Sequence, residues 1–170
     1  MIRLLNGFYR ILLCLGAICM ITTLLSIVLG VVERQFDFEI PGLDAYAGYS
    51  IAGALFLALP ETLRKGDHIR VTLILNKLNG RARTVADYWC LGAAVLVSTY
   101  LAYFAVRLVW LSYLTHDVSP ASDASPLWIP QIPMALGCIG LSVAFIEDLV
   151  RKILSCERVA LPSDELAHIE

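Results

Sequence analysis

The sequence RKGDHIRVTLILNKL (residues 64–78) lies between two long apolar stretches and decides how they are arranged. Gly66 allows the backbone to turn, and Asp67 is a residue type that caps the start of a helix. Beyond this turn the apolar positions recur with helical spacing, namely Val71, Ile74, Leu75 and Leu78. A helix over residues 69–78 is too short to cross a bilayer, but it can lie in the membrane plane. The stretch therefore predicts a turn followed by a short amphipathic helix on a membrane surface.

The composition of the whole chain is that of a membrane protein. It is 58% hydrophobic and 16% charged, whereas soluble domains carry about 25% charged residues. Four segments are long and apolar enough to span a bilayer: residues 11–32, 43–63, 85–114 and 127–150. As a helix, residues 11–32 would be about 33 Å long, against a hydrocarbon core of about 30 Å. The expected fold is a single all-α integral membrane domain of four transmembrane helices plus the in-plane helix, followed by a polar tail (residues 151–170).

Basic residues predict the orientation of these segments. Of the 13 Lys and Arg residues, six lie between residues 64 and 83 (Arg64, Lys65, Arg70, Lys77, Arg81 and Arg83). Arg3 and Arg10 precede the first segment, and Arg151, Lys152 and Arg158 follow the fourth. The loops on the opposite side hold only Arg34. Because cytoplasmic loops are enriched in Lys and Arg, both termini and residues 64–78 are expected in the cytoplasm.

Arg107 is a basic residue inside the third predicted span. A cation within a membrane helix marks a candidate functional position. Arg107 nevertheless lies only one turn inside Trp110, so its side chain can also snorkel to the outer surface. Two interpretations stay open: a snorkelling or structurally paired side chain, and a contact with a partner subunit.

Small residues and charges predict how the helices meet. Ala94, Ser98 and Ala102 repeat every four residues and predict a packing seam on the third span. Near the end of the fourth span, Glu147 and Asp148 precede Arg151 and Lys152 by four residues each. This spacing predicts ion pairs along one helix, which would anchor it at the membrane edge.

Patterns for catalysis, a cofactor or a metal site are missing from the sequence. Its five cysteines form no CxxC pair, and no segment combines a nucleophile, a base and an orienting group. Haem held by two histidines needs both within the bilayer, but His68, His116 and His168 lie in loops or the tail. A net charge of −2 gives no basis for nucleic-acid binding. We therefore expect a non-enzyme without cofactors.

Two motifs resemble the small membrane subunit of TRAP transporters, the tripartite ATP-independent periplasmic transporters. The first is Arg64-x-Gly66-x-His68-Ile69-x-Val71, after the second span. The second is Ser125-Pro126-x-x-Ile129-Pro130, which opens the fourth span. The chain departs from the family at Thr72, where an acidic residue often follows the Val of the first motif. Any contact made by that carboxylate in the family is not expected here.

The resemblance implies a non-catalytic subunit of a bacterial inner-membrane transporter. Its partners would be a large multi-span permease subunit, which carries the substrate and sodium sites, and a periplasmic binding protein that delivers an organic acid. The small subunit would clasp the permease and widen its static scaffold. The residues expected at the partner or membrane interface are Arg64, Gly66, His68, Ile69, Val71, Ile74, Leu75, Arg107, Pro126 and Pro130.

Two other classes of protein remain open from the sequence. One is an independent four-helix transporter or channel that acts as a homo-oligomer. The other is a membrane anchor or assembly factor for a redox complex. Flux through the purified chain alone would favour the first, and co-purification with haem or iron–sulfur subunits would favour the second.

Overall fold

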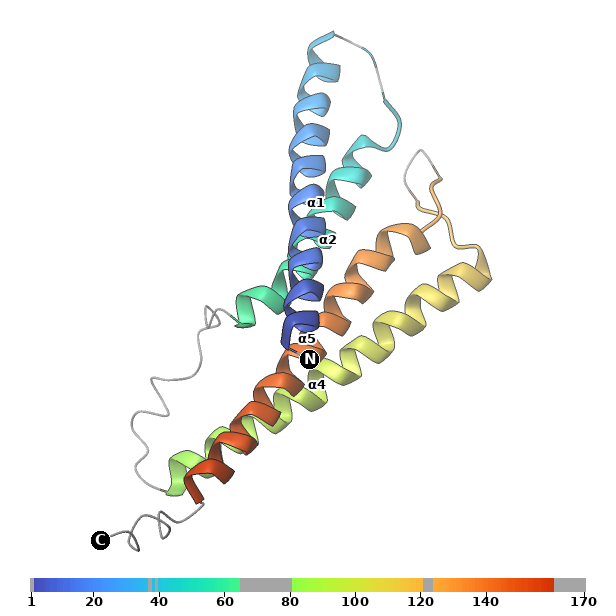
Figure 1. Ribbon diagram of the computed structural model, residues 1–170. Coiled ribbons are helices and arrows are strands. Elements are labelled where there is room, and N and C mark those ends of the chain that lie inside the picture. Colours follow the sequence, from blue (N-terminus) through green and yellow to red (C-terminus); the bar gives the residue numbers. More distant parts are fainter. Residues whose placement is uncertain (1, 37, 39, 65–80, 121–123, 161–170) are drawn as a thin grey trace, which may run out of the picture.

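The computed structural model describes residues 2–36, 38, 40–64, 81–120 and 124–160. Most of these residues form α1 (Ile2–Phe36), α2 (Leu43–Arg64), α4 (Arg81–Thr115) and α5 (Trp128–Ala160) (Figure 1). Each of these helices is long and apolar enough to cross a membrane. The prediction of an all-α protein with four long apolar helices is confirmed. The in-plane helix predicted for residues 69–78 lies outside the described residues.

Two helices extend well beyond the apolar segments from which they were predicted. α1 begins at Ile2, so the first helix also includes residues 2–10, which precede the predicted span. α5 runs to Ala160, through residues 151–160 of the predicted polar tail. Polar contacts support this extension, since Arg151 pairs with Glu147 one turn earlier and Lys152 pairs with Asp87 on α4.

The connection from α1 to α2 turns at Pro41-Gly42. Gly42 has a φ of 86°, in the left-handed region that favours glycine. Its carbonyl oxygen accepts a hydrogen bond from the Tyr46 backbone N–H at 3.1 Å, which closes the first turn of α2. Asp44 lies in that turn, where a negative charge interacts favourably with the positive end of the helix dipole.

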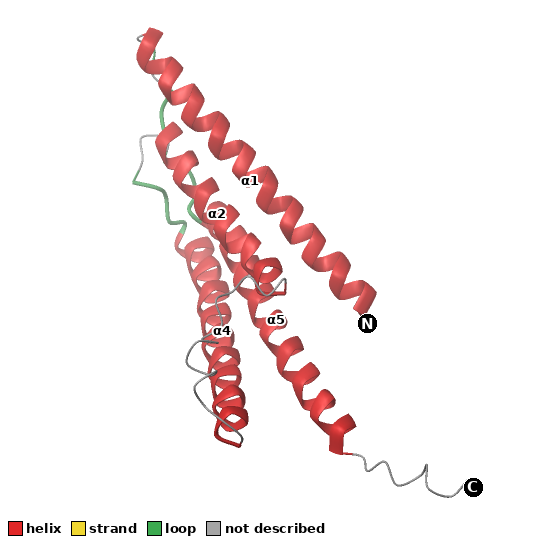
Figure 2. Cartoon of the chain, turned by 90° about the vertical axis from the view of Figure 1, so that its left-hand side faces the viewer, coloured by secondary structure: helices red, strands yellow, loops and turns green. Residues whose placement is uncertain are grey.

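The helices are arranged as two pairs that meet through α2 and α5. α1 packs along α2, α2 packs on α5, and α4 packs along α5, whereas α1 touches α5 only slightly. In Figures 1 and 2, α1 and α4 lie on opposite sides with α2 and α5 between them. Figure 1 shows the α1–α2 pair diverging from the α4–α5 pair toward the loop that follows α1. The described helices therefore form an open arrangement instead of a closed bundle.

Glycines make the α2–α5 contact close. A methyl group at Gly137 of α5 would overlap the backbone carbonyl of Phe56 on α2. A methyl group at Gly140 would lie 2.8 Å from the Pro60 ring. Such close backbone approach favours helix association in membranes, where packing replaces the hydrophobic effect between helices.

The α4–α5 contact follows the predicted small-residue seam. Ser98 and Ala102 are buried, at 3% and 9% exposure, and Ala105 continues the seam one turn further. Ala102 and Ala105 pack against Ala135 and Cys138 of α5. A hydrogen bond between the hydroxyls of Thr99 and Ser142, 3.0 Å apart, joins the same two helices.

Candidate functional site

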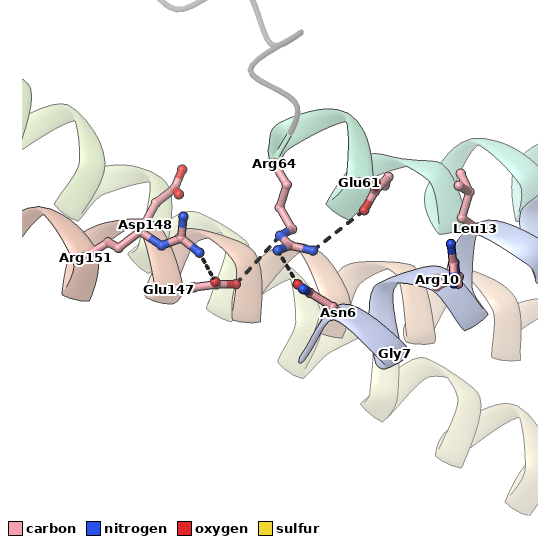
Figure 3. Close-up of a pocket in the computed structure, with 9 residues that line it drawn as sticks. All are labelled: Asn6, Gly7, Arg10, Leu13, Glu61, Arg64, Glu147, Asp148 and Arg151. Carbon is pink, nitrogen blue, oxygen red and sulfur yellow. Dashed lines mark hydrogen bonds and ion pairs between the residues drawn. The ribbon is translucent and has the colours of Figure 1, made fainter. Parts of the chain in front are cut away.

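The most connected polar group in the described structure surrounds Arg64, the last residue of α2. We call it the Arg64 cluster, and its members are Asn6, Tyr9, Glu61, Arg64, Glu147 and Arg151. They come from α1, α2 and α5, at the end of the α1–α2 pair where α1 begins and α2 ends, and partway along α5 (Figures 1 and 3). The cluster therefore joins α5 to the end of the α1–α2 pair.

Arg64 contacts all three of these helices. Its Nη2 donates a hydrogen bond to the side-chain oxygen of Asn6 on α1 at 2.6 Å. Its Nε lies 3.9 Å from Glu147 Oε2 on α5, and its Nη1 lies 3.9 Å from Glu61 Oε2 on its own helix. The guanidinium also covers the Tyr9 ring, at 4.5 Å from the ring centroid. Since arginine offers five donors in a planar fork, one side chain can hold several neighbours in fixed directions.

Glu147 is the acidic centre of the cluster. It accepts a hydrogen bond from the Tyr9 hydroxyl at 3.3 Å and one from Arg151 at 2.6 Å, in addition to its ion pair with Arg64. Its side chain is only 15% exposed. Tyr9 is fully buried beneath it, together with Leu63 and Ala144. Charge-assisted hydrogen bonds at such a part-buried position are stronger than those at the open surface.

The ion pairing predicted along the fourth span is confirmed between Glu147 and Arg151, and Lys152 makes a contact with another helix. Glu147 and Arg151 form the expected i, i+4 pair. Lys152 pairs with Asp87 on α4 at 2.7 Å, and its ammonium lies 5.2 Å from the centroid of the Tyr88 ring. These side chains connect α5 to three other helices, so they do more than anchor α5 at a membrane edge.

A cavity of about 810 Å³ opens beside the Arg64 cluster. It is lined by every cluster member except Tyr9, and also by Gly7, Arg10, Leu13 and Asp148. Figure 3 shows these side chains converging from α1, α2 and α5. The lining therefore holds both basic and acidic side chains.

The opposite end of the molecule is held by a smaller polar contact. The hydroxyls of Tyr49 on α2 and Ser119 in the α4–α5 connection lie 2.7 Å apart. The Ser119 N–H donates to the carbonyl of Ser125 at 2.7 Å, and Val118 forms an isolated bridge with Pro126. This folded connection ties α2 to the start of α5.

The predicted site residues are distributed along the whole molecule. Arg64 lies in the cluster just described. Pro126 is exposed in the connection before α5, and Pro130 lies in the first turn of α5, where a missing N–H costs little. Arg107 is exposed on α4, with its guanidinium 5.9 Å from the Phe104 ring centroid. The other expected positions, Gly66, His68, Ile69, Val71, Ile74 and Leu75, fall outside the described residues.

Sequence reasoning missed three contributors to these contacts. Asn6 and Tyr9 precede the first predicted span, and Asp87 was not considered. A usable signal exists on α1, where buried or part-buried small residues recur at Gly16, Cys19 and Thr23, on the face that carries Tyr9. That periodicity identifies the packed side of α1 and therefore the side from which Tyr9 reaches Glu147.

The fold and these contacts define the class of the protein. It is a multi-pass helical membrane protein whose helices are joined by polar contacts. Residues 23–155 match the family described as tripartite ATP-independent periplasmic transporters, DctQ component. This match covers well over half of the chain, and the chain therefore belongs to the DctQ family, the small Q component of TRAP transporters. No curated protein sequence matches the chain.

Proposed function

We propose that this chain braces the large permease subunit of a TRAP transporter during sodium-driven uptake of an organic acid. A periplasmic binding protein delivers the acid, and the complex lies in a bacterial inner membrane with both termini of this chain in the cytoplasm. Membership of the DctQ family supports a role in a tripartite transporter. The observation that carries the bracing role is the open arrangement of the two helix pairs.

This arrangement leaves large apolar faces on the outer helices. On α1, Ile18 and Leu25 are 58% and 62% exposed. On α4, Tyr100, Tyr103 and Trp110 are between 63% and 65% exposed. In a membrane such faces contact lipid or another protein, and aromatic side chains are enriched where proteins meet. A chain that clasps a larger subunit needs such a face, and α4 supplies one because α5 is its main packing partner among the described helices.

The polar contacts make this open frame stiff. The Arg64 cluster joins α1, α2 and α5 at one end, and the Tyr49–Ser119 contact joins α2 to the α4–α5 connection at the other. The close Gly137–Phe56 approach holds α2 against α5 between them. A frame joined at two separate levels can resist tilting while a neighbouring domain carries its cargo across the membrane. The in-plane helix expected at residues 69–78 would set the depth of this frame.

The test replaces the apolar face of the expected in-plane helix with charge. We expect the triple variant Val71→Asp, Ile74→Asp and Leu75→Asp to lose co-purification with the permease or to lose uptake in proteoliposomes supplied with binding protein, substrate and a sodium gradient. The matched control is Thr72→Asp with Asn76→Asp, which adds charge to the polar side of the same helix. Unchanged assembly and uptake in the triple variant would contradict the proposed role of this helix in bracing.

A second measurement separates bracing from independent transport. The purified chain alone, reconstituted in liposomes, is expected to give no sodium-dependent uptake of organic acids. Uptake by the chain alone would overturn the proposal in favour of a stand-alone transporter. Recovery of haem or iron–sulfur subunits with the tagged chain, in place of a permease, would favour a redox-complex anchor.

A further inference from the structure

One basic side chain that lines the cavity, Arg10, makes no hydrogen bond or ion pair with the Arg64 cluster. Arg10 lines the cavity from α1 and is exposed. Within the described ranges, it has no hydrogen-bond or ion-pair partner. Figure 3 shows it beside Leu13, with Glu61 across from it on α2. An unpaired guanidinium at the end of a membrane helix is a ready donor for an anion at headgroup depth.

Asn6 adds a second donor on the same side of α1. Its side-chain oxygen accepts the 2.6 Å hydrogen bond from Arg64, which orients the amide and leaves its NH₂ group as a donor. Asn6 and Arg10 are four residues apart and therefore neighbours on one helix face. Together they offer donors to a phosphate that enters the cavity.

The same face of α1 becomes apolar in the next turns. Leu13, Met20 and Leu24 continue the line of Asn6 and Arg10, and they are 38%, 58% and 62% exposed. A stripe that runs from polar donors to exposed apolar side chains matches a molecule with a phosphate at one end and a hydrocarbon chain at the other. A free phosphate ion would make no use of the apolar part.

The charges of the lining indicate the kind of headgroup. Arg10, Arg64 and Arg151 face the same cavity as Glu61, Glu147 and Asp148, so the formal charges cancel. A zwitterionic headgroup carries a phosphate and an ammonium. It can therefore interact with the basic and with the acidic side chains of the lining. Glu61 lines the same cavity from α2, and its carboxylate, which lies 3.9 Å from Arg64 Nη1, can also accept the ammonium (Figure 3).

We propose that this cavity binds the headgroup of an aminophospholipid. Arg10 and Asn6 bind its phosphate, Glu61 accepts its ammonium, and an acyl chain lies along the Leu13, Met20 and Leu24 stripe. Bound in this way, the lipid fills the space between α1, α2 and α5 beside the Arg64 cluster. The site belongs to this chain alone and does not depend on the proposed bracing of a permease.

The test measures lipid retention by the purified full chain. In native mass spectrometry, the wild type is expected to retain one dioleoylphosphatidylethanolamine under conditions that strip other lipids. Arg10→Gln should weaken this retention at least tenfold, because the phosphate loses its charged donor. The control is Arg34→Gln, the same substitution near the other end of the same helix, which should retain the lipid like the wild type.

A thermal-unfolding series in detergent distinguishes the possible ligands. Dioleoylphosphatidylethanolamine should raise the unfolding temperature of the wild type and of Arg34→Gln, but not that of Arg10→Gln. Inorganic phosphate should have no effect, and dioleoylphosphatidylglycerol should have less effect than the aminophospholipid. Arg10→Lys, which keeps the charge, should retain part of the lipid effect and shows that a loss in Arg10→Gln is not a folding defect.

Three results would overturn the assignment. Equal lipid retention in Arg10→Gln and the wild type would remove Arg10 from the site. Equal stabilisation by inorganic phosphate would indicate a simple anion site. Stronger retention of dioleoylphosphatidylglycerol would contradict the zwitterionic headgroup.

Discussion

At the scale of single residues, the ion pair between Arg64 and Glu147 is expected to stabilise the fold. Their side chains are 23% and 15% exposed, so water screens them only in part. In a double-mutant cycle of Arg64→Gln and Glu147→Gln, we expect a coupling of about 1 kcal/mol in the free energy of unfolding, within the range for contacting residues. Glutamine keeps the shape of the glutamate side chain and the first part of the arginine side chain. Unfolding by SDS in mixed micelles, followed by circular dichroism, measures the coupling.

The Lys152–Asp87 pair is the matched comparison for this cycle. It is closer, at 2.7 Å, but more exposed, at 33% and 36%. Exposed pairs contribute little to stability, so we expect Lys152→Gln and Asp87→Asn to couple by less than about 0.5 kcal/mol. A Lys152–Asp87 coupling equal to or larger than that of Arg64–Glu147 would show that burial of the Arg64 cluster does not strengthen its contacts.

At the scale of helices, the α2–α5 contact depends on the missing side chain of Gly137. We expect Gly137→Ala to destabilise the protein by about 1–3 kcal/mol, the usual cost of overpacking. The added methyl group would overlap the Phe56 backbone carbonyl, which cannot rotate away as a side chain could. The two helices would have to separate, and the SDS-unfolding midpoint should fall accordingly.

Gly92 provides the control for this substitution. It lies on α4 with nothing within 4 Å of the position of an added methyl group. Gly92→Ala should leave stability unchanged or raise it by up to about 1 kcal/mol, because alanine is the better helix former. If Gly137→Ala behaved like Gly92→Ala, the close approach of α2 to α5 would not be important for stability.

At the scale of the whole molecule, the proposed orientation predicts which end of each helix pair faces the periplasm. In a chain whose native cysteines are replaced by serine, we expect Val118→Cys to react with a membrane-impermeant maleimide added to intact spheroplasts. Leu154→Cys should react only after the membrane is opened. Both positions are accessible within the molecule, at 59% and 53% exposure, so burial does not limit labelling.

The comparison between the two cysteines is internal, because each serves as the control for the other. Inside-out membrane vesicles should reverse the pattern. Labelling of Leu154→Cys, but not Val118→Cys, in intact spheroplasts would place the termini in the periplasm and contradict the count of basic residues.

Much of the fold could be predicted from the sequence because the determining forces are local. A segment without charges and long enough to cross hydrocarbon has to satisfy its backbone internally, and a helix does this within the segment itself. The four helices therefore follow from apolar length, and the α4 seam follows from the spacing of Ser98 and Ala102. The polar turns of α1 before residue 11 and of α5 after residue 150 were not predicted as helix, because their support comes from other parts of the chain.

The sequence by itself determined the class of this protein, its four long helices, its family motifs and the expected orientation. Only the tertiary structure decided that Arg64 meets Asn6 and Glu147, which lie 58 and 83 positions away in the chain, and that Lys152 pairs with Asp87 on α4. The physical reason is that a pairing between helices depends on their relative depth and rotation. Side-chain spacing within one helix specifies neither quantity, and close packing at Gly137, Gly140 and Tyr9 specifies both.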